Sequence, residues 1–109
     1  MVEFRGELND RAQIEVAAPE GTVVFKGRSD SAINGGAKIS VVAKKLELIG
    51  AVNGPDTSLD VTLTKDGALK FRRVNGGVRL HYRKGNANDP ALRIEAGGID
   101  ARADFREMK

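Results

Sequence analysis

The sequence predicts an all-β chain folded as a single-domain parallel β-solenoid of about five coils, each 21–23 residues long. Apolar and polar residues alternate with a period of two through much of the chain, which is typical of strands with one buried face. No stretch has a convincing helical period. Asparagine, glycine and proline residues gather between the alternating stretches, where they favour turns. At 109 residues the chain has the length of one domain.

A short apolar–x–apolar segment recurs along the chain and sets the proposed coil length. Its first apolar residue stands at positions 2, 23, 46, 69 and 92, so the spacing is 21 residues once and then 23. The segments are Val2-Glu3-Phe4, Val23-Val24-Phe25, Leu46-Glu47-Leu48, Leu69-Lys70-Phe71 and Leu92-Arg93-Ile94. We predict one coil for each of them, over residues 1–21, 22–44, 45–67, 68–90 and 91–109.

A second alternating stretch follows each of these segments. The second stretches cover residues 14–16, 39–41, 59–63, 78–82 and 99–105. Turn residues, among them Asn34-Gly35-Gly36, Asn53-Gly54-Pro55 and Asn75-Gly76-Gly77, lie between the strands. The alternation places apolar residues such as Leu46, Leu48, Leu69, Phe71, Leu92 and Ile94 in the core.

An antiparallel β-sandwich or barrel built from hairpins is the alternative fold. Asn-Gly-Gly between two alternating stretches is a fair hairpin signal. The constant spacing favours the solenoid, because the corners of stacked coils must lie over one another. No cap for the terminal coils is evident. We therefore expect the ends to meet further coils of a parent protein, another copy of the chain or a cap that the sequence does not reveal.

The charge is uneven along the chain. The formal net charge is +3, and residues 67–109 hold ten basic and five acidic side chains, whereas residues 1–66 hold eight and ten. A basic C-terminal face could contact a polyanion such as nucleic acid or an acidic glycan. The candidate contact residues are Arg72, Arg79, Arg83, Lys84, Arg93 and Arg102.

Residue types that carry catalysis or metal binding are scarce. The chain has no cysteine and a single histidine, His81, so a zinc site is not expected. No glycine-rich nucleotide loop occurs, and no cofactor is expected. Two acidic pairs could in principle serve a hydrolase, namely Glu47 with Asp60 and Glu95 with Asp100. Charged solenoids offer such pairs by chance, so the sequence predicts a protein that is not an enzyme.

The C-terminal part of the chain resembles a known family. Val74-Asn75-Gly76-Gly77-Val78 opens an alternating strand, and Gly97-Gly98-Ile99 leads to Asp104-Phe105. This pattern, over residues 67–106, resembles the bacterial adhesin-type β-solenoid repeat family. The segment Tyr82-Arg83-Lys84 departs from it, since the family usually closes that strand with Leu-Pro. The polymer-forming bactofilins have a similar texture but shorter coils.

The resemblance implies a non-catalytic structural or surface-display domain of a bacterial envelope protein. It implies a place in the cell envelope or outside the cell as part of an exported parent protein. The N-terminus has no secretory signal, so a cytoplasmic place is the alternative. No apolar run is long enough to insert in a membrane. The expected partners are a second copy stacked end to end, further coils of a parent protein or, in the alternative function, a polyanion.

Overall fold

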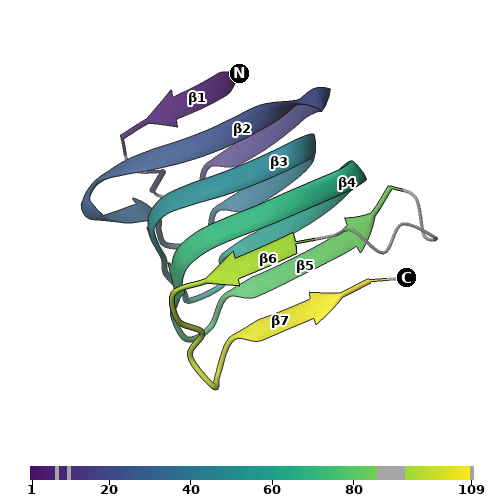
Figure 1. Cartoon of the computed structure of the whole chain (residues 1–109). Coiled ribbons are helices and arrows are strands. Elements are labelled where there is room, and N and C mark those ends of the chain that lie inside the picture. The colour runs from purple at the N-terminus through teal and green to yellow at the C-terminus, as the bar shows by residue number, and fades with distance from the viewer. Residues whose placement is uncertain (7, 10, 86–92, 109) are drawn as a thin grey trace.

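The computed structural model describes residues 1–6, 8–9, 11–85 and 93–108, and every regular element among them is a β-strand. The strands are β1 (Val2–Arg5), β2 (Gln13–Ile33), β3 (Lys38–Val52), β4 (Ser58–Val74), β5 (Arg79–Lys84), β6 (Arg93–Ala96) and β7 (Asp104–Glu107). All strand pairs are parallel, in the order β1-β2-β3-β4-β5-β7 with β6 also on β4. The chain is a β-solenoid of about 4 turns, so the predicted fold class is confirmed and the barrel alternative is wrong (Figure 1).

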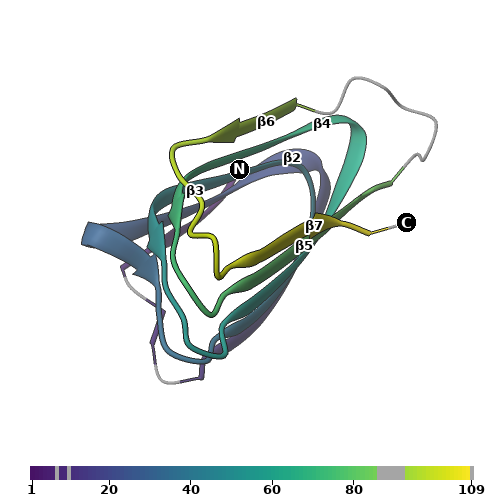
Figure 2. The same cartoon turned by 90° about the horizontal axis from the view of Figure 1, so that it is seen from below.

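The long strands bend around corners, which gives the solenoid a roughly triangular cross-section (Figure 2). Face A consists of residues 13–18, 38–43 and 58–63 together with β5 and β7. Face B consists of β1, residues 22–26, 45–49 and 68–71, and β6. Face C is a short column of Leu8, Ile33, Val52, Val74 and Ile99. One passage over the faces is called a layer below.

The core fills the space between the faces with columns of stacked apolar side chains. On face B, Val23, Leu46 and Leu69 form one fully buried column. The neighbouring column begins with Phe4 and Phe25, whose rings stack with centroids 4.8 Å apart. These pairings are the ones that the sequence spacing predicts, because each inward residue of one layer lies directly on its equivalent in the next.

The last layer has a different register from the predicted one. Leu69 pairs with Ile94, and Phe71 pairs with Ala96, so the spacing here is 25 residues. Leu92, the expected partner of Leu69, lies outside the described residues. The connection from face A to face B runs from Lys84 to Arg93 in this layer, but only from Ala43 to Lys45 in β3. A shift of two residues keeps the same side chains inward, so alternation alone does not reveal it.

Asparagine side chains stack at the corner between faces C and A. The Asn34 amide nitrogen donates to Asn9 Oδ1 over 2.8 Å, and that of Asn53 donates to Asn34 Oδ1 over 2.6 Å. Asn75 in turn donates to Asn53. Asp100 occupies the equivalent position in the last layer, because its backbone N–H donates to Val74 O as that of Asn75 donates to Val52 O. This asparagine ladder fixes the corner through successive layers.

The corner also depends on two glycine positions. Gly77 has a φ of 82°, in the left-handed region that glycine adopts without strain. Gly54 lies so close to the next layer that an added Cβ would stand 2.2 Å from Gly76 O. Glycines here therefore let consecutive corners approach one another and keep the layers in contact.

We predict that Phe71→Ala lowers the free energy of unfolding by about 3–5 kcal/mol. Phe71 is 3% exposed and its ring lies against that of Phe105, so its removal leaves a cavity. Ile49→Ala is the control, since Ile49 is 40% exposed. Urea unfolding measures both changes. Equal losses for the two variants would contradict the observed register.

Candidate functional site

The six basic residues expected to contact a polyanion do not form one stripe. Arg79 and Arg83 project from face A, whereas Arg93 belongs to face B. Lys84 is the last residue of β5, in register with the inward-facing Leu63. The remaining two lie at corners: Arg72 lines a hollow of about 440 Å³ after face B, and Arg102 lies against Gly76.

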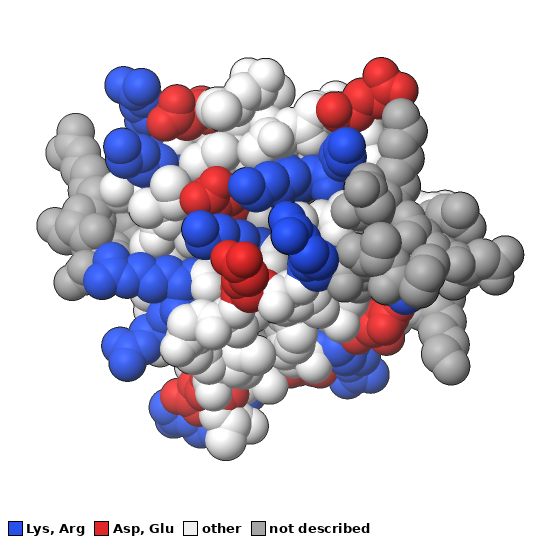
Figure 3. Space-filling model, viewed as in Figure 1, with Lys and Arg blue, Asp and Glu red and all other residues white. Residues whose placement is uncertain are grey.

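Ion pairs neutralise several of the basic side chains. Arg83 Nη1 lies 2.6 Å from Asp60 Oδ1, one layer away, and Arg102 Nη2 lies 3.2 Å from Asp100 Oδ2. The hydrogen bond from Arg102 lowers the pKa of the Asp100 carboxyl. On face B, Lys70 pairs with Glu95 over 3.8 Å. Figure 3 accordingly shows basic and acidic side chains interleaved in the middle of the visible face.

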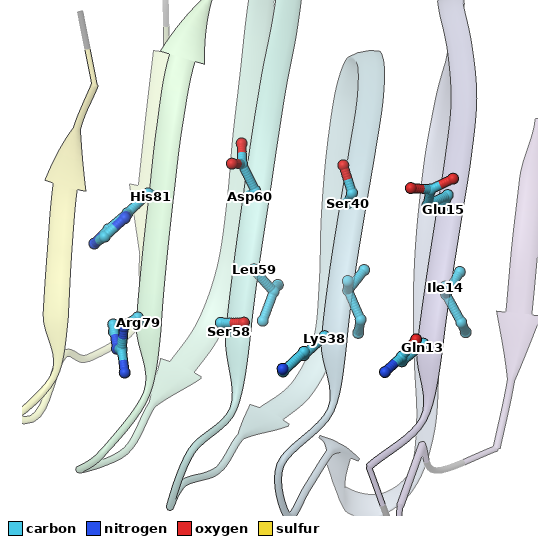
Figure 4. A pocket seen from close by; sticks show the side chains of 11 residues that line it. Gln13, Ile14, Glu15, Lys38, Ser40, Ser58, Leu59, Asp60, Arg79 and His81 are labelled. Carbon is cyan, nitrogen blue, oxygen red and sulfur yellow. The ribbon is translucent and has the colours of Figure 1, made fainter.

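A surface groove of about 760 Å³ runs along face A (Figure 4). Outward side chains of β2 to β5 line it in two rows. One row holds Gln13, Lys38, Ser58 and Arg79, and the other holds Glu15, Ser40, Asp60 and His81. The rows exist because strand alternation sends every second residue outward and the parallel register aligns these residues. The lining therefore combines both signs of charge with hydroxyl groups.

His81 has a carboxylate partner that was not predicted from the sequence. Its Nε2 lies 3.0 Å from Asp104 Oδ2, on the neighbouring strand β7. Asp104 also accepts two hydrogen bonds from Arg106. These bonds, from Arg106 first and then from His81, lower the pKa of Asp104 to about 2. The residues are 23 positions apart, which is the spacing of the repeat.

The polar groups of face A lack the arrangement of a nucleophilic site. In the described part of the chain, no hydroxyl group is hydrogen-bonded to His81, and such a bond is what a histidine base needs to activate serine or threonine. The prediction that Glu47 and Asp60 could form an acidic pair is wrong. Glu47 is on face B and Asp60 on face A, because the chain turns a corner between their strand segments.

The described residues hold neither a candidate metal-binding cluster nor a membrane-spanning helix. They contain no group of three or more histidine, aspartate or glutamate side chains that could hold a metal ion. They also contain no helix that is long and apolar enough to span a bilayer.

At the two ends of the solenoid, apolar residues in core positions are exposed, whereas the exposed Ile49 of the middle layers belongs to face B. At the C-terminal end, Ile94 and Ile99 occupy inward positions but are 38% and 45% exposed. At the N-terminal end, Val2 is 37% exposed, and Phe4 and Ile14 are half-buried. Their equivalents in the middle layers are fully buried, so the exposure arises because the terminal layers have a neighbour on one side only.

The chain has no match among protein-family models, curated proteins or solved structures. The sequence reading placed the candidate residues on a basic face, and the structure distributes them over faces and corners. The lack of an evident cap in the sequence predicted uncovered ends. The exposed Ile94 and Ile99 identify core positions at the C-terminal end.

We predict that Asp104→Asn flattens the acid dependence of stability. The folded-state pKa of Asp104 is about 2, below its ordinary value of 3.8, so its contribution to stability is present above pH 3.8 and is lost as the pH falls through about 2. Thermal unfolding followed by circular dichroism across this range measures the effect. Arg106→Gln keeps the carboxylate but removes the main cause of the shift, and should flatten the curve in part. An unchanged pH profile in both variants would contradict the pairing.

Proposed function

We propose that this chain is a non-catalytic structural solenoid domain that associates end to end. The single observation that carries the proposal is the exposure of core positions at both ends, notably Ile94 and Ile99 at one and Val2 at the other. Between the ends, the described apolar core is closed by the layers above and below it. The ends are therefore the surfaces with most to gain from a partner.

The backbone supports the same interpretation. The edge strands at the N-terminal end are β1 and the first part of β2, and those at the C-terminal end are β6 and β7. An edge strand presents backbone N–H and C=O groups that pair with any strand laid against them. A second solenoid end would satisfy these groups and cover apolar side chains at the same time.

The setting of this domain is part of the proposal and rests on the resemblance of residues 67–106 alone. A surface-display role in an exported bacterial envelope protein fits a stack of coils, because each added layer extends the structure by ~4.8 Å. The partner at each end is then either another copy or further coils of a parent protein. The faces are left to solvent.

We predict that the unmodified chain forms larger species as its concentration rises, and that Ile99→Lys weakens this association by about tenfold or more. A lysine at the C-terminal end would bury an unpaired charge in the joint. Sedimentation velocity over a range of concentration and salt measures it, with negative-stain images of the same samples. Ile49→Lys is the matched control, because Ile49 is 40% exposed and Ile99 is 45% exposed.

Three results would contradict the proposal. A monomer at every concentration rules out association, and equal weakening by Ile99→Lys and Ile49→Lys places it elsewhere. Association that disappears at moderate salt indicates charged rather than apolar contacts. Thermal unfolding of each variant confirms that it is folded.

Polyanion binding is the second candidate function, and the groove on face A favours it in one respect. Lys38 and Arg79 lie in one row of the groove, on either side of Ser58, and neither has an ion-pair partner among the described residues. Phosphate or sulfate groups need only such cations. Glu15 and Asp60 in the second row oppose this binding, so it would be weak.

We predict that a labelled single-stranded oligonucleotide binds weakly at low salt and is released between about 50 and 200 mM salt. Arg79→Gln should reduce binding, while Arg93→Gln, which removes a charge from face B, should not. Fluorescence anisotropy measures both. No binding at the lowest salt, or equal loss in the two variants, would count against a polyanion site in the groove.

A further inference from the structure

The first and last layers of the solenoid are built alike. The first runs from β1 on face B through Leu8 on face C and Asn9 at the corner to residues 13–16 on face A. The last runs from β6 through Ile99 and Asp100 to β7, over the same faces in the same order. The N-terminal layer of one copy therefore has the shape of the layer that would follow the C-terminal layer of another.

The asparagine ladder gives the two ends opposite hydrogen-bonding character. Each amide nitrogen in the ladder donates toward the N-terminal end, from Asn75 to Asn53, then to Asn34 and to Asn9. The Asn9 oxygen is thereby occupied, and its amide nitrogen has no partner among the described residues. At the other end the equivalent residue is Asp100, whose ionised carboxylate only accepts.

We propose that a second copy of this chain docks head to tail, with its N-terminal layer on the C-terminal layer of the first and Asn9 placed over Asp100. This inference rests on the proposed function and specifies the partner, the polarity and the register of the joint. The Asn9 amide then donates to a carboxylate, so the ladder continues from one copy into the next. Asp100 retains its hydrogen bonds from Arg102.

The same register aligns the apolar columns on every face. Val2 of one copy comes over Ile94 of the other, because both are equivalents of Val23, Leu46 and Leu69. Leu8 comes over Ile99 on face C, and Ile14 over Phe105 on face A. The exposed core residues of the two ends thus cover one another.

Charge complementarity supports this register on face A. Glu15 of one copy comes beside Arg106 of the other, since both belong to the column of Ser40, Asp60 and His81. Within one copy this column begins with the acidic Glu15 at the N-terminal end and ends with the basic Arg106 at the C-terminal end. A head-to-tail joint therefore adds a cross-strand pair of opposite charge.

The other two polarities lack these contacts. A head-to-head joint that aligns this corner brings two Asn9 amide groups together, each with one oxygen lone pair already used by Asn34, and a tail-to-tail joint that aligns it brings two Asp100 carboxylates together. Both also reverse the strand direction at the joint, which removes the continuation of the parallel columns. The ladder therefore discriminates between joints that the apolar residues alone would tolerate.

Two contacts in the proposed joint are unfavourable and limit its strength. On face B, Glu3 comes beside Glu95, which has the same charge. On face A, the apolar Val16 comes beside the charged Glu107. Like charges on directly opposed strand positions destabilise a sheet. Replacing Glu3 and Glu95 removes one of these contacts, and both are outward positions suited to a probe.

The chain has no cysteine, so pairs of introduced cysteines report the joint directly. Glu3→Cys and Glu95→Cys are prepared as separate single variants, one of them isotope-labelled, mixed and oxidised. Adjacent strands hold these positions within reach of a disulfide. The control mixture pairs Glu3→Cys with Arg93→Cys, which lies two residues along β6 on the same outward side. Mass spectrometry of the linked peptides identifies the partners.

We expect Glu3→Cys and Glu95→Cys to cross-link roughly tenfold or more faster than the control pair, because docking raises the effective concentration of aligned thiols. Faster linkage of the control pair, or predominant linkage of either variant to itself, overturns the proposed register or polarity. Sedimentation of the unmodified chain distinguishes a failure of this inference from a failure of the proposed end-to-end association. Association without the expected cross-link refutes only this inference, whereas a monomer that forms no cross-link refutes the proposed function as well.

Discussion

The structure depends on one constraint, the in-register parallel pairing of each layer with the next. In a solenoid the backbone N–H and C=O groups point along the axis, so each layer satisfies them only through its neighbours. The pairing places equivalent residues over one another, as with Val23, Leu46 and Leu69 in the core. The same pairing aligns the asparagines at the corner. Core, corner and surface rows are therefore consequences of a single register.

This register also determines how charge is distributed. A residue on an outward face lies beside its equivalent in the next layer and within reach of the residue two positions along that strand, so opposite charges in adjacent layers form pairs. Asp60 pairs diagonally with Arg83 in this way, and His81 pairs diagonally with Asp104. A net charge of +3 consequently does not produce a continuous basic surface. Among the described residues, the middle layers have neighbours on both sides, whereas the edge strands and the exposed core positions lie in the first and last layers.

The alternation and the constant spacing were sufficient to predict the solenoid and most of its register, including the stacking of Phe4 on Phe25. They could not predict the last register, because a two-residue shift leaves Ile94 inward as before. The predicted basic C-terminal face did not form because charge was counted along the chain, while corners separate Arg79 from Arg93 and Arg102. The pairing of His81 with Asp104 was accessible, since its separation of 23 residues is that of the repeat.

Affinity and specificity at the ends have different sources. Apolar columns such as those ending at Val2 and Ile94 are stabilised by any contact that buries their surface. A register shift of two residues or a partner of reversed polarity would still bury apolar surface. Polar groups are less tolerant, because a misplaced donor or acceptor loses its solvent partner without gaining another. Asn9 and Asp100 are therefore the residues that can distinguish one joint from its alternatives. In the proposed head-to-tail joint, the apolar columns therefore supply the buried area and the corner ladder sets the polarity.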